Sequence, residues 1–285
     1  MRFHVIETGH FKLDGGAMFG VVPKVLWQRT NPADSNNRIS LTARSLLIAH
    51  QNRLVLIDTG LGNKQSTRFF SHYDRFGHYS LEHSITQAGY TLDEITDVFL
   101  THLHFDHVGG ATVRNNENKI VPTFKNATYW VHQKQWDWAN NPNPREKASF
   151  LPENLDPLYQ SGQLQFINED SQSENKKPFF FDILFVDGHT EKQMLPLITY
   201  KGQSFVFAAD LIPTYGHMPI PYIMGYDVRP LVTMSEKFEF LNIAVSKGYF
   251  LFMEHDIENE IISLTQTPKG VRMAESLKLS DLFST

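Results

Sequence analysis

The sequence of 285 residues contains no cysteine, which excludes disulfides, thiolate metal ligands and a cysteine nucleophile. It also lacks any apolar run that approaches the roughly 20 residues of a membrane span. Residues 1–16 have no basic start followed by an apolar core, so no signal peptide is visible. The net charge is −5 without long runs of lysine or arginine, which argues against nucleic-acid binding. We therefore expect a cytoplasmic protein that binds neither membranes nor nucleic acid.

Apolar residues make up 41% of the chain and aromatic residues 13%, which is ample for a sizeable core. A chain of this length could form one large domain or two small ones. The most loop-like stretch, residues 168–178, is polar and aperiodic but too short to mark a boundary. We predict a single domain over residues 1–285.

Short runs rich in Phe, Val and Ile predict buried strands, and apolar residues three to four apart predict helices. Leu231, Met234, Phe238, Leu241 and Val245 have that helical spacing. Clusters of strands separated by helices favour an α/β (α+β) fold with two sheets covered by helices. The predicted strands are 3–7, 41–49, 54–57, 98–100, 127–131, 179–186, 195–200, 203–209 and 249–253. The predicted helices are 80–88, 132–139, 153–159 and about 231–245.

Side chains of the metal-ligand type follow four of the predicted strands. The stretch THLHFDHVGG, residues 101–110, places three histidines and an aspartate within six positions, before the flexible pair Gly109-Gly110. Later strands end near one further donor each. Together they supply seven nitrogen or oxygen donors, namely His102, His104, Asp106, His107, His189, Asp210 and His255. Of the other histidines, those at positions 4, 10, 50, 72, 78, 83 and 132 are expected to be surface or locally bonded residues.

Imidazole nitrogen and carboxylate oxygen suit zinc, and also manganese, cobalt or iron(II). Seven donors are too many for one tetrahedral ion but suit two divalent ions that share a carboxylate. Such a pair of ions promotes hydrolysis. A surface tract rich in histidine is the structural alternative, and the strand that precedes each donor argues against it.

The order of these residues resembles the metal signature of the metallo-β-lactamase superfamily. The resemblance implies an αβ/βα sandwich of two mixed sheets flanked by helices. It also implies that Asp58, in LVLIDTG, orients a ligand imidazole. It assigns His102, His104 and His189 to one ion and Asp106, His107 and His255 to the other, with Asp210 bridging them. Asp106 and Asp210 are then the expected catalytic carboxylates.

A narrower resemblance lies in residues 14–24, followed by Leu26 and Trp27, and in residues 210–214 with His217. These stretches are similar to the YtnP-like branch of quorum-quenching N-acyl-homoserine lactonases. On this basis Met18 and Phe19 would form an apolar wall for an acyl chain, although an ordinary buried hairpin is the alternative. His217 or Tyr222 would bond the substrate carbonyl.

The interpretation that we prefer is a dinuclear lactonase, most plausibly with zinc, that opens N-acyl-homoserine lactones through attack by a metal-bridging hydroxide. Asp210 would carry a proton to the leaving alkoxide. A phosphotriesterase or phosphodiesterase is one alternative, and a metal-bound ligand-binding protein with little turnover is another. Apolar Phe- and Trp-rich loops favour a homodimer. The sequence leaves open the acyl-chain length, the native metal and the residue that bonds the carbonyl.

Overall fold

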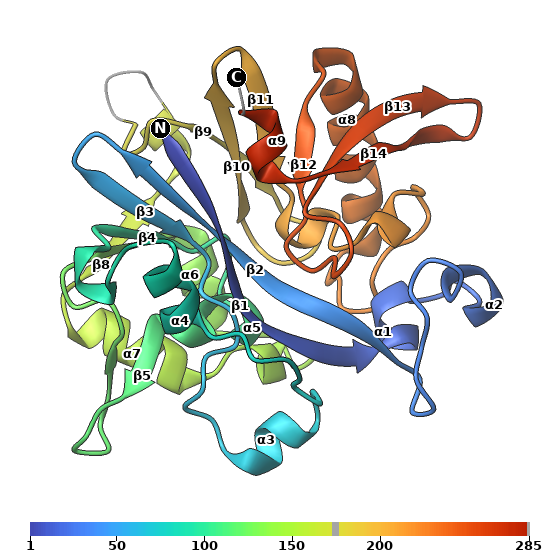
Figure 1. Ribbon diagram of the computed structural model, residues 1–285. Helices are drawn as coiled ribbons and strands as arrows, with labels where there is room; N and C mark the ends of the chain where they lie inside the picture. The colour runs from blue at the N-terminus through green and yellow to red at the C-terminus, as the bar shows by residue number, and fades with distance from the viewer. Residues whose placement is uncertain (173–176, 284–285) are drawn as a thin grey trace. The chain divides into compact units, whose positions relative to one another are not determined.

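The computed structural model describes residues 1–172 and 177–283. The chain forms two compact units, unit 1 (Met1–Phe11 and Ala43–Ser173) and unit 2 (Lys12–Thr42 and Glu174–Thr285). The described residues form two six-stranded sheets, both mixed and accompanied by helices (Figure 1). This confirms the predicted fold class, while the extent of the domain stays a prediction.

The sheet of unit 1 has the strand order β1-β2-β3-β4-β7-β8. Strands β3, β4, β7 and β8 run parallel, whereas β2 pairs with β3 in the antiparallel sense. The outer ends of β1 and β2, residues 12–14 and 38–42, are assigned to unit 2. The bounds are β1 (Arg2–Asp14), β2 (Arg38–His50), β3 (Arg53–Ile57), β4 (Asp97–Phe99), β7 (Thr128–His132) and β8 (Leu164–Ile167).

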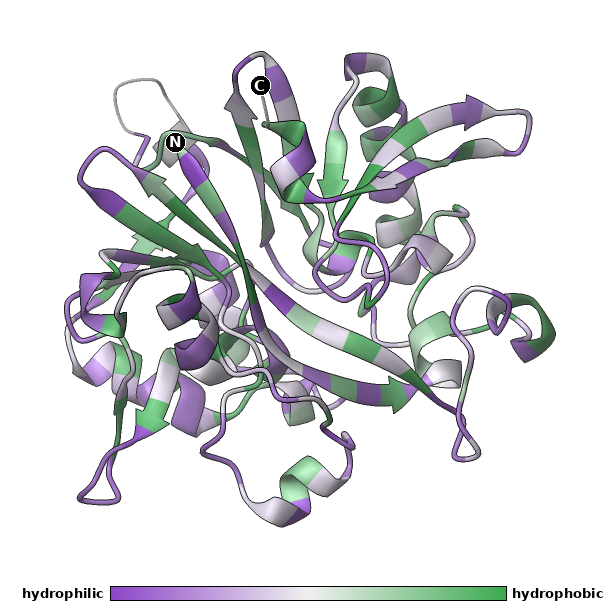
Figure 2. Ribbon diagram, viewed as in Figure 1, coloured by the Kyte–Doolittle hydropathy of each residue, from purple (hydrophilic) through white to green (hydrophobic). Residues whose placement is uncertain are grey.

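Three helices in the described part of unit 1 begin at a residue whose side chain caps them. Ser80 accepts from the backbone N–H of His83 and starts one helix, and the His132 imidazole accepts from Lys134 N and starts another. The β5–β6 turn is hydrophilic, as a solvated hairpin tip should be (Figure 2). The elements are α3 (Thr67–Ser71), α4 (Leu81–Gln87), α5 (Phe105–Val108), β5 (Thr112–Arg114), β6 (Ile120–Pro122), α6 (Gln133–Asn140) and α7 (Pro152–Gln160).

The sheet of unit 2 has the order β14-β13-β12-β11-β10-β9. Only β11 and β12 pair in parallel, and every other neighbour is antiparallel. Helix α8 lies beside β13 and β14 (Figure 1). The elements are α1 (Gly15–Phe19), α2 (Lys24–Trp27), β9 (Asp182–Val186), β10 (Gln193–Tyr200), β11 (Gln203–Phe207), α8 (Pro230–Lys247), β12 (Phe250–Phe252), β13 (Ile261–Thr267), β14 (Gly270–Leu277) and α9 (Leu279–Leu282).

Several predicted bounds need correction. The strand predicted over 179–186 begins at Asp182, because Phe179 and Phe181 stack on each other with ring centroids 4.8 Å apart and close a bend. Part of the predicted loop at 168–178 is a 3-10 turn, Glu169–Gln172, and residues 173–176 lie outside the described part of the chain. The sequence reasoning also missed β5, β6, β8, β13 and β14, which are short or weakly apolar.

The helix predicted at about 231–245 is present as α8, but its apolar stripe does not coincide with one buried face. Leu231 is 75% exposed and Phe238 is 54% exposed, whereas Leu241 of the same stripe is buried. The buried face of α8 carries Thr233, Lys237, Phe240, Leu241 and Ala244. Residues 228–247 are apolar on more than one side, so their periodicity alone could not choose the face that packs.

Among the residues that the structure describes, none of the helices combines the length and apolarity needed to cross a bilayer.

Candidate metal centre

The ligand-rich stretch of unit 1 begins directly after strand β4. His102 and His104 lie in an extended turn, and the short helix α5 then carries the two residues Asp106 and His107. All four side chains are buried. The parallel pairing of β3, β4 and β7 places this turn at the carboxyl ends of the strands, which is a usual position for a site in α/β folds.

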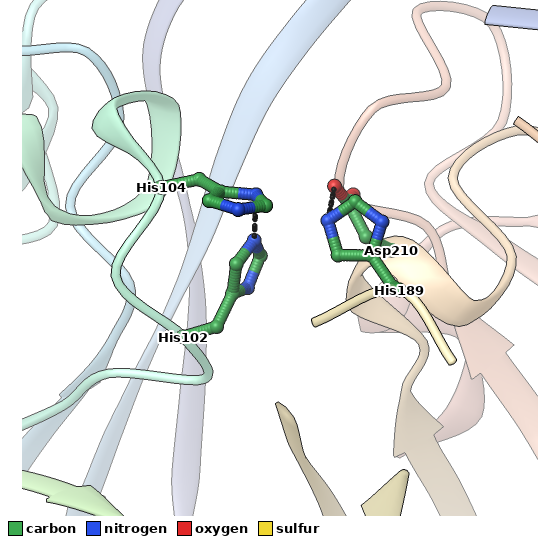
Figure 3. A group of neighbouring side chains, drawn as sticks. All are labelled: His102, His104, His189 and Asp210. Atoms are coloured by element: carbon green, nitrogen blue, oxygen red, sulfur yellow. Dashed lines mark hydrogen bonds and ion pairs between the residues drawn. The ribbon is translucent and has the colours of Figure 1, made fainter. Parts of the chain in front are cut away.

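The imidazoles of His102 and His104 face each other across 3.1 Å, measured from Nε2 of the first to Nδ1 of the second (Figure 3). The other nitrogen of each ring already has a partner. His104 Nε2 lies 2.8 Å from Glu146 Oε1, and His102 Nδ1 lies 3.1 Å from Thr101 Oγ1. A carboxylate accepts the N–H of His104, and the Thr101 hydroxyl, which donates to Asp58, accepts that of His102. Two ring lone pairs are therefore aimed at one point, as in a cation site.

Asp58, to which the family resemblance assigns a role in orienting a ligand imidazole, lies beside His107. Its Oδ2 lies 3.1 Å from His107 Nδ1, and its carboxylate also accepts the backbone N–H and the hydroxyl of Thr101 at 2.8 and 2.6 Å. This leaves the Nε2 lone pair of His107 for a metal ion. Asp58 has φ +56°, a strained conformation for a non-glycine residue that is often retained at functional sites.

The sequence reasoning missed Glu146, the second carboxylate that orients a histidine in unit 1. Besides His104 it accepts the indole N–H of Trp138 at 2.6 Å and the amide N–H of Asn143 at 3.1 Å. These bonds hold a buried carboxylate in one position. Glu146 ends the turn-rich stretch NNPNPRE, residues 140–146, and does not follow a strand, so no local pattern pointed to it.

In unit 2 the turn after β9 carries His189. The backbone N–H groups of Asp187 and Gly188 donate to the Glu236 carboxylate at 2.7 and 3.0 Å. A Cβ on Gly188 would lie 2.3 Å from Thr233 N, so only glycine lets this turn approach α8. His189 Nδ1 donates to Asp227 Oδ1 at 2.8 Å, an interaction that the sequence analysis also missed.

Asp210 joins His189 and His255 within unit 2. Its Oδ2 lies 3.0 Å from His189 Nε2 (Figure 3), and its Oδ1 lies 3.1 Å from His255 Nε2. His255 Nδ1 must donate to the Thr42 carbonyl at 2.9 Å, because a carbonyl oxygen only accepts. Both imidazoles therefore turn Nε2 toward the same carboxylate. Ala209 has φ +40°, so the turn that presents Asp210 is strained.

The carboxylates around His189 and His255 favour a positive charge between them. Burial lowers the pKa of His189, but the carboxylates of Asp210 and Asp227 outweigh it and raise that pKa to about 10. His189 therefore keeps a proton on Nε2, where the nitrogen lone pair would otherwise repel the Asp210 carboxylate. A divalent cation would satisfy the same atoms, so the donor set fits a metal ion.

The four residues predicted to bind substrate, Met18, Phe19, His217 and Tyr222, all lie in unit 2 but differ in how far they are engaged inside the protein. Met18 and Phe19 are buried, and Phe19 stacks between Trp27 and His217 at centroid distances of 5.3 and 4.2 Å. His217 donates from Nε2 to Met18 O at 2.9 Å, and its Nδ1 lies 2.8 Å from Thr214 Oγ1. Burial lowers the pKa of His217 to about 3, so the ring is neutral. Both ring nitrogens are thus engaged internally, which makes Tyr222 the better candidate for a substrate contact.

The chain belongs to the metallo-β-lactamase superfamily, whose family model matches residues 41–255. A probable metal-dependent hydrolase from Staphylococcus aureus is similar to it, with 26% identity and a TM-score of 0.85 over 97% of this chain and 98% of that chain. AidC, described as a dizinc quorum-quenching lactonase, has 20% identity and a TM-score of 0.78 over 97% and 95% of the two chains.

AiiA of B. thuringiensis, solved as a variant with N-decanoyl-L-homoserine at its active site, has 16% identity and a TM-score of 0.67 over 90% and 93% of the two chains. No curated protein matches the sequence. At these identities the likeness to the two lactonases shows the fold, and the superfamily assignment rests on the family model.

Proposed function

We propose that the protein is a dinuclear metal-dependent hydrolase that opens N-acyl-homoserine lactones. The proposal of a metal centre rests mainly on the partners that orient the histidines. In each of the five candidate histidines one ring nitrogen forms a hydrogen bond to a neighbouring group, and the other nitrogen points toward another candidate metal ligand. His102, His104 and His189 would hold one ion, and Asp106, His107 and His255 the other. Asp210, which lies between two histidines, would bridge them.

Bound divalent ions, for which zinc is our first choice, would supply charge stabilisation and an ionised water near neutral pH. The chain itself would orient the ligands and manage the protons. Asp210 would carry a proton to the oxygen that leaves when the lactone C–O bond breaks. The Tyr222 hydroxyl would donate to the substrate carbonyl. Asp106 would act as the second catalytic carboxylate.

The choice of a lactone is supported by two features. Residues 14–24, and residues 210–214 with His217, are similar to the YtnP-like lactonases, and the fold is shared with structures described as lactonases. Tyr222 lines a cavity of unit 2 together with the apolar residues Leu26, Met218 and Met273. Such a surface suits an acyl chain, since each buried methylene contributes about 0.8 kcal/mol.

Activity assays would test this proposal directly. Protein of measured metal content would be assayed against an N-acyl-homoserine lactone, a phosphotriester, a phosphodiester and a thioester. We expect lactone turnover that falls strongly in Asp210→Asn and persists in His83→Ala, a change on the exposed face of α4. If only the phosphoesters were hydrolysed, the proposed substrate would be a phosphoester and not a lactone. Tight metal binding without any turnover would favour a ligand-binding protein.

We also propose that the protein forms a homodimer. Val21 is 96% exposed and Val25 is 63% exposed, and both lie in the apolar segment around α2. Light scattering of the wild type and of Val25→Glu would test this, since a monomeric mass in both would contradict it.

A further inference from the structure

Helix α8 carries a lysine on its buried face. Lys237 is 1% exposed and lies on the same face as Phe240, Leu241 and Ala244. An ammonium group is almost never fully buried unless its charge and its N–H groups are satisfied. The groups around Lys237 should therefore offset the free-energy cost of burying its charge, and they should indicate why a lysine is needed at this position.

All three bonds of the Lys237 ammonium go to one short segment. Nζ donates to the carbonyl oxygens of His217, Pro219 and Tyr222 at 3.0, 3.0 and 2.8 Å. An ammonium has three N–H groups and no acceptor, so three carbonyls satisfy it completely. We call residues 217–222 the carbonyl segment.

His217, at the start of the carbonyl segment, is also held by Met18 O and Thr214 Oγ1, but residues 219–222 have little other support. This stretch contains Pro219 and Pro221, which lack a backbone N–H, and its own backbone bonds are local turns such as Tyr222 N to Pro219 O at 2.9 Å. On another side Met218, Pro219 and Tyr222 border a cavity of about 330 Å³. Open space cannot hold a loop by packing, so the ammonium bonds take that role.

We propose that Lys237 is a positioning residue for substrate binding, which fixes the carbonyl segment and thereby the place of Tyr222. This inference rests on the proposed function, in which Tyr222 contacts the substrate. Without the ammonium, three carbonyls lose their donor and the segment can shift toward the cavity. The metal ligands do not belong to the segment, so the effect should fall on substrate binding.

The test uses Lys237→Met, Lys237→Ala and, as a matched control, Lys247→Met at the exposed end of the same helix. Loss of the ammonium bonds should raise KM roughly tenfold while kcat and metal content stay within about threefold of wild type. Propylamine should partly restore KM in Lys237→Ala, because it replaces the missing carbons and the ammonium. 1-Propanol, which offers a single donor, should not. Lys247→Met should behave as wild type.

A second measurement works without any substrate. Hydrogen exchange at the amides of Met218, Ile220 and Tyr222 should speed up in Lys237→Ala and slow again with propylamine. This result would support the positioning role even if no lactone is hydrolysed, so it separates this inference from the proposed function. Unchanged exchange and KM would overturn it. Equal losses of kcat, metal content and folding stability, without rescue by propylamine, would also overturn it.

Discussion

Replacing Asp227 with asparagine should weaken metal binding without removing the ligand that it orients. Asp227 accepts the Nδ1–H of His189 at 2.8 Å and is buried, so the bond is shielded from water. Asparagine keeps the size and an acceptor oxygen but loses the negative charge that favours a cation beside the ring. Loss of such an orienting partner costs about 10- to 100-fold in metal affinity, or about 1.4 to 2.7 kcal/mol.

The affinity would be measured by titrating metal-free protein with zinc in competition with a chromophoric chelator. The control is Asp97→Asn, because Asp97 is also a buried aspartate but bonds to Arg53 and Trp130 at the start of β4. The control should lose stability and keep the zinc affinity of the wild type. Wild-type affinity in Asp227→Asn, or an equal loss in both variants, would refute the reasoning.

Three further predictions concern the ions, the substrate and pH. His189→Ala and His255→Ala should each lower metal content by about one ion per chain in elemental analysis, whereas His83→Ala should not. Four extra acyl methylenes should raise kcat/KM by up to about two decades, and a flat chain-length profile would contradict an acyl pocket. Burial lowers the pKa of Lys237 to about 7 from its ordinary 10.5, opposed by Asp227 and aided by Arg272. Between these pH values the unfolded state binds more protons than the folded state does. The difference in free energy of unfolding between wild type and Lys237→Met should therefore rise with pH, by up to about 1.4 kcal/mol per pH unit. Below pH 7 this difference should become constant. Urea titrations from pH 6 to 10 would show a flat difference if the lysine kept its ordinary pKa.

The class of fold that the sequence predicts is confirmed, and the metal ligands that it proposes stay a prediction based on local features of the chain. Each donor follows an apolar run that really is a strand, and the strand ends are local events that a short stretch of residues specifies. Asp58 follows β3 as well, but its role came from the family resemblance and not from this position. The superfamily signature depends on this order along the chain, which is why the family was visible before the structure.

Only the tertiary structure revealed the residues that orient the ligands and the face of α8 that is buried. Glu146 is 42 positions from His104 and Asp227 is 38 from His189, and neither lies in a pattern that points to its partner. From its charge alone, Lys237 would be predicted to lie on the solvent-exposed face of its helix. It is buried because three carbonyls of a distant segment satisfy its ammonium group. Contacts of this kind depend on how the folded chain brings remote segments together, and no local periodicity encodes that.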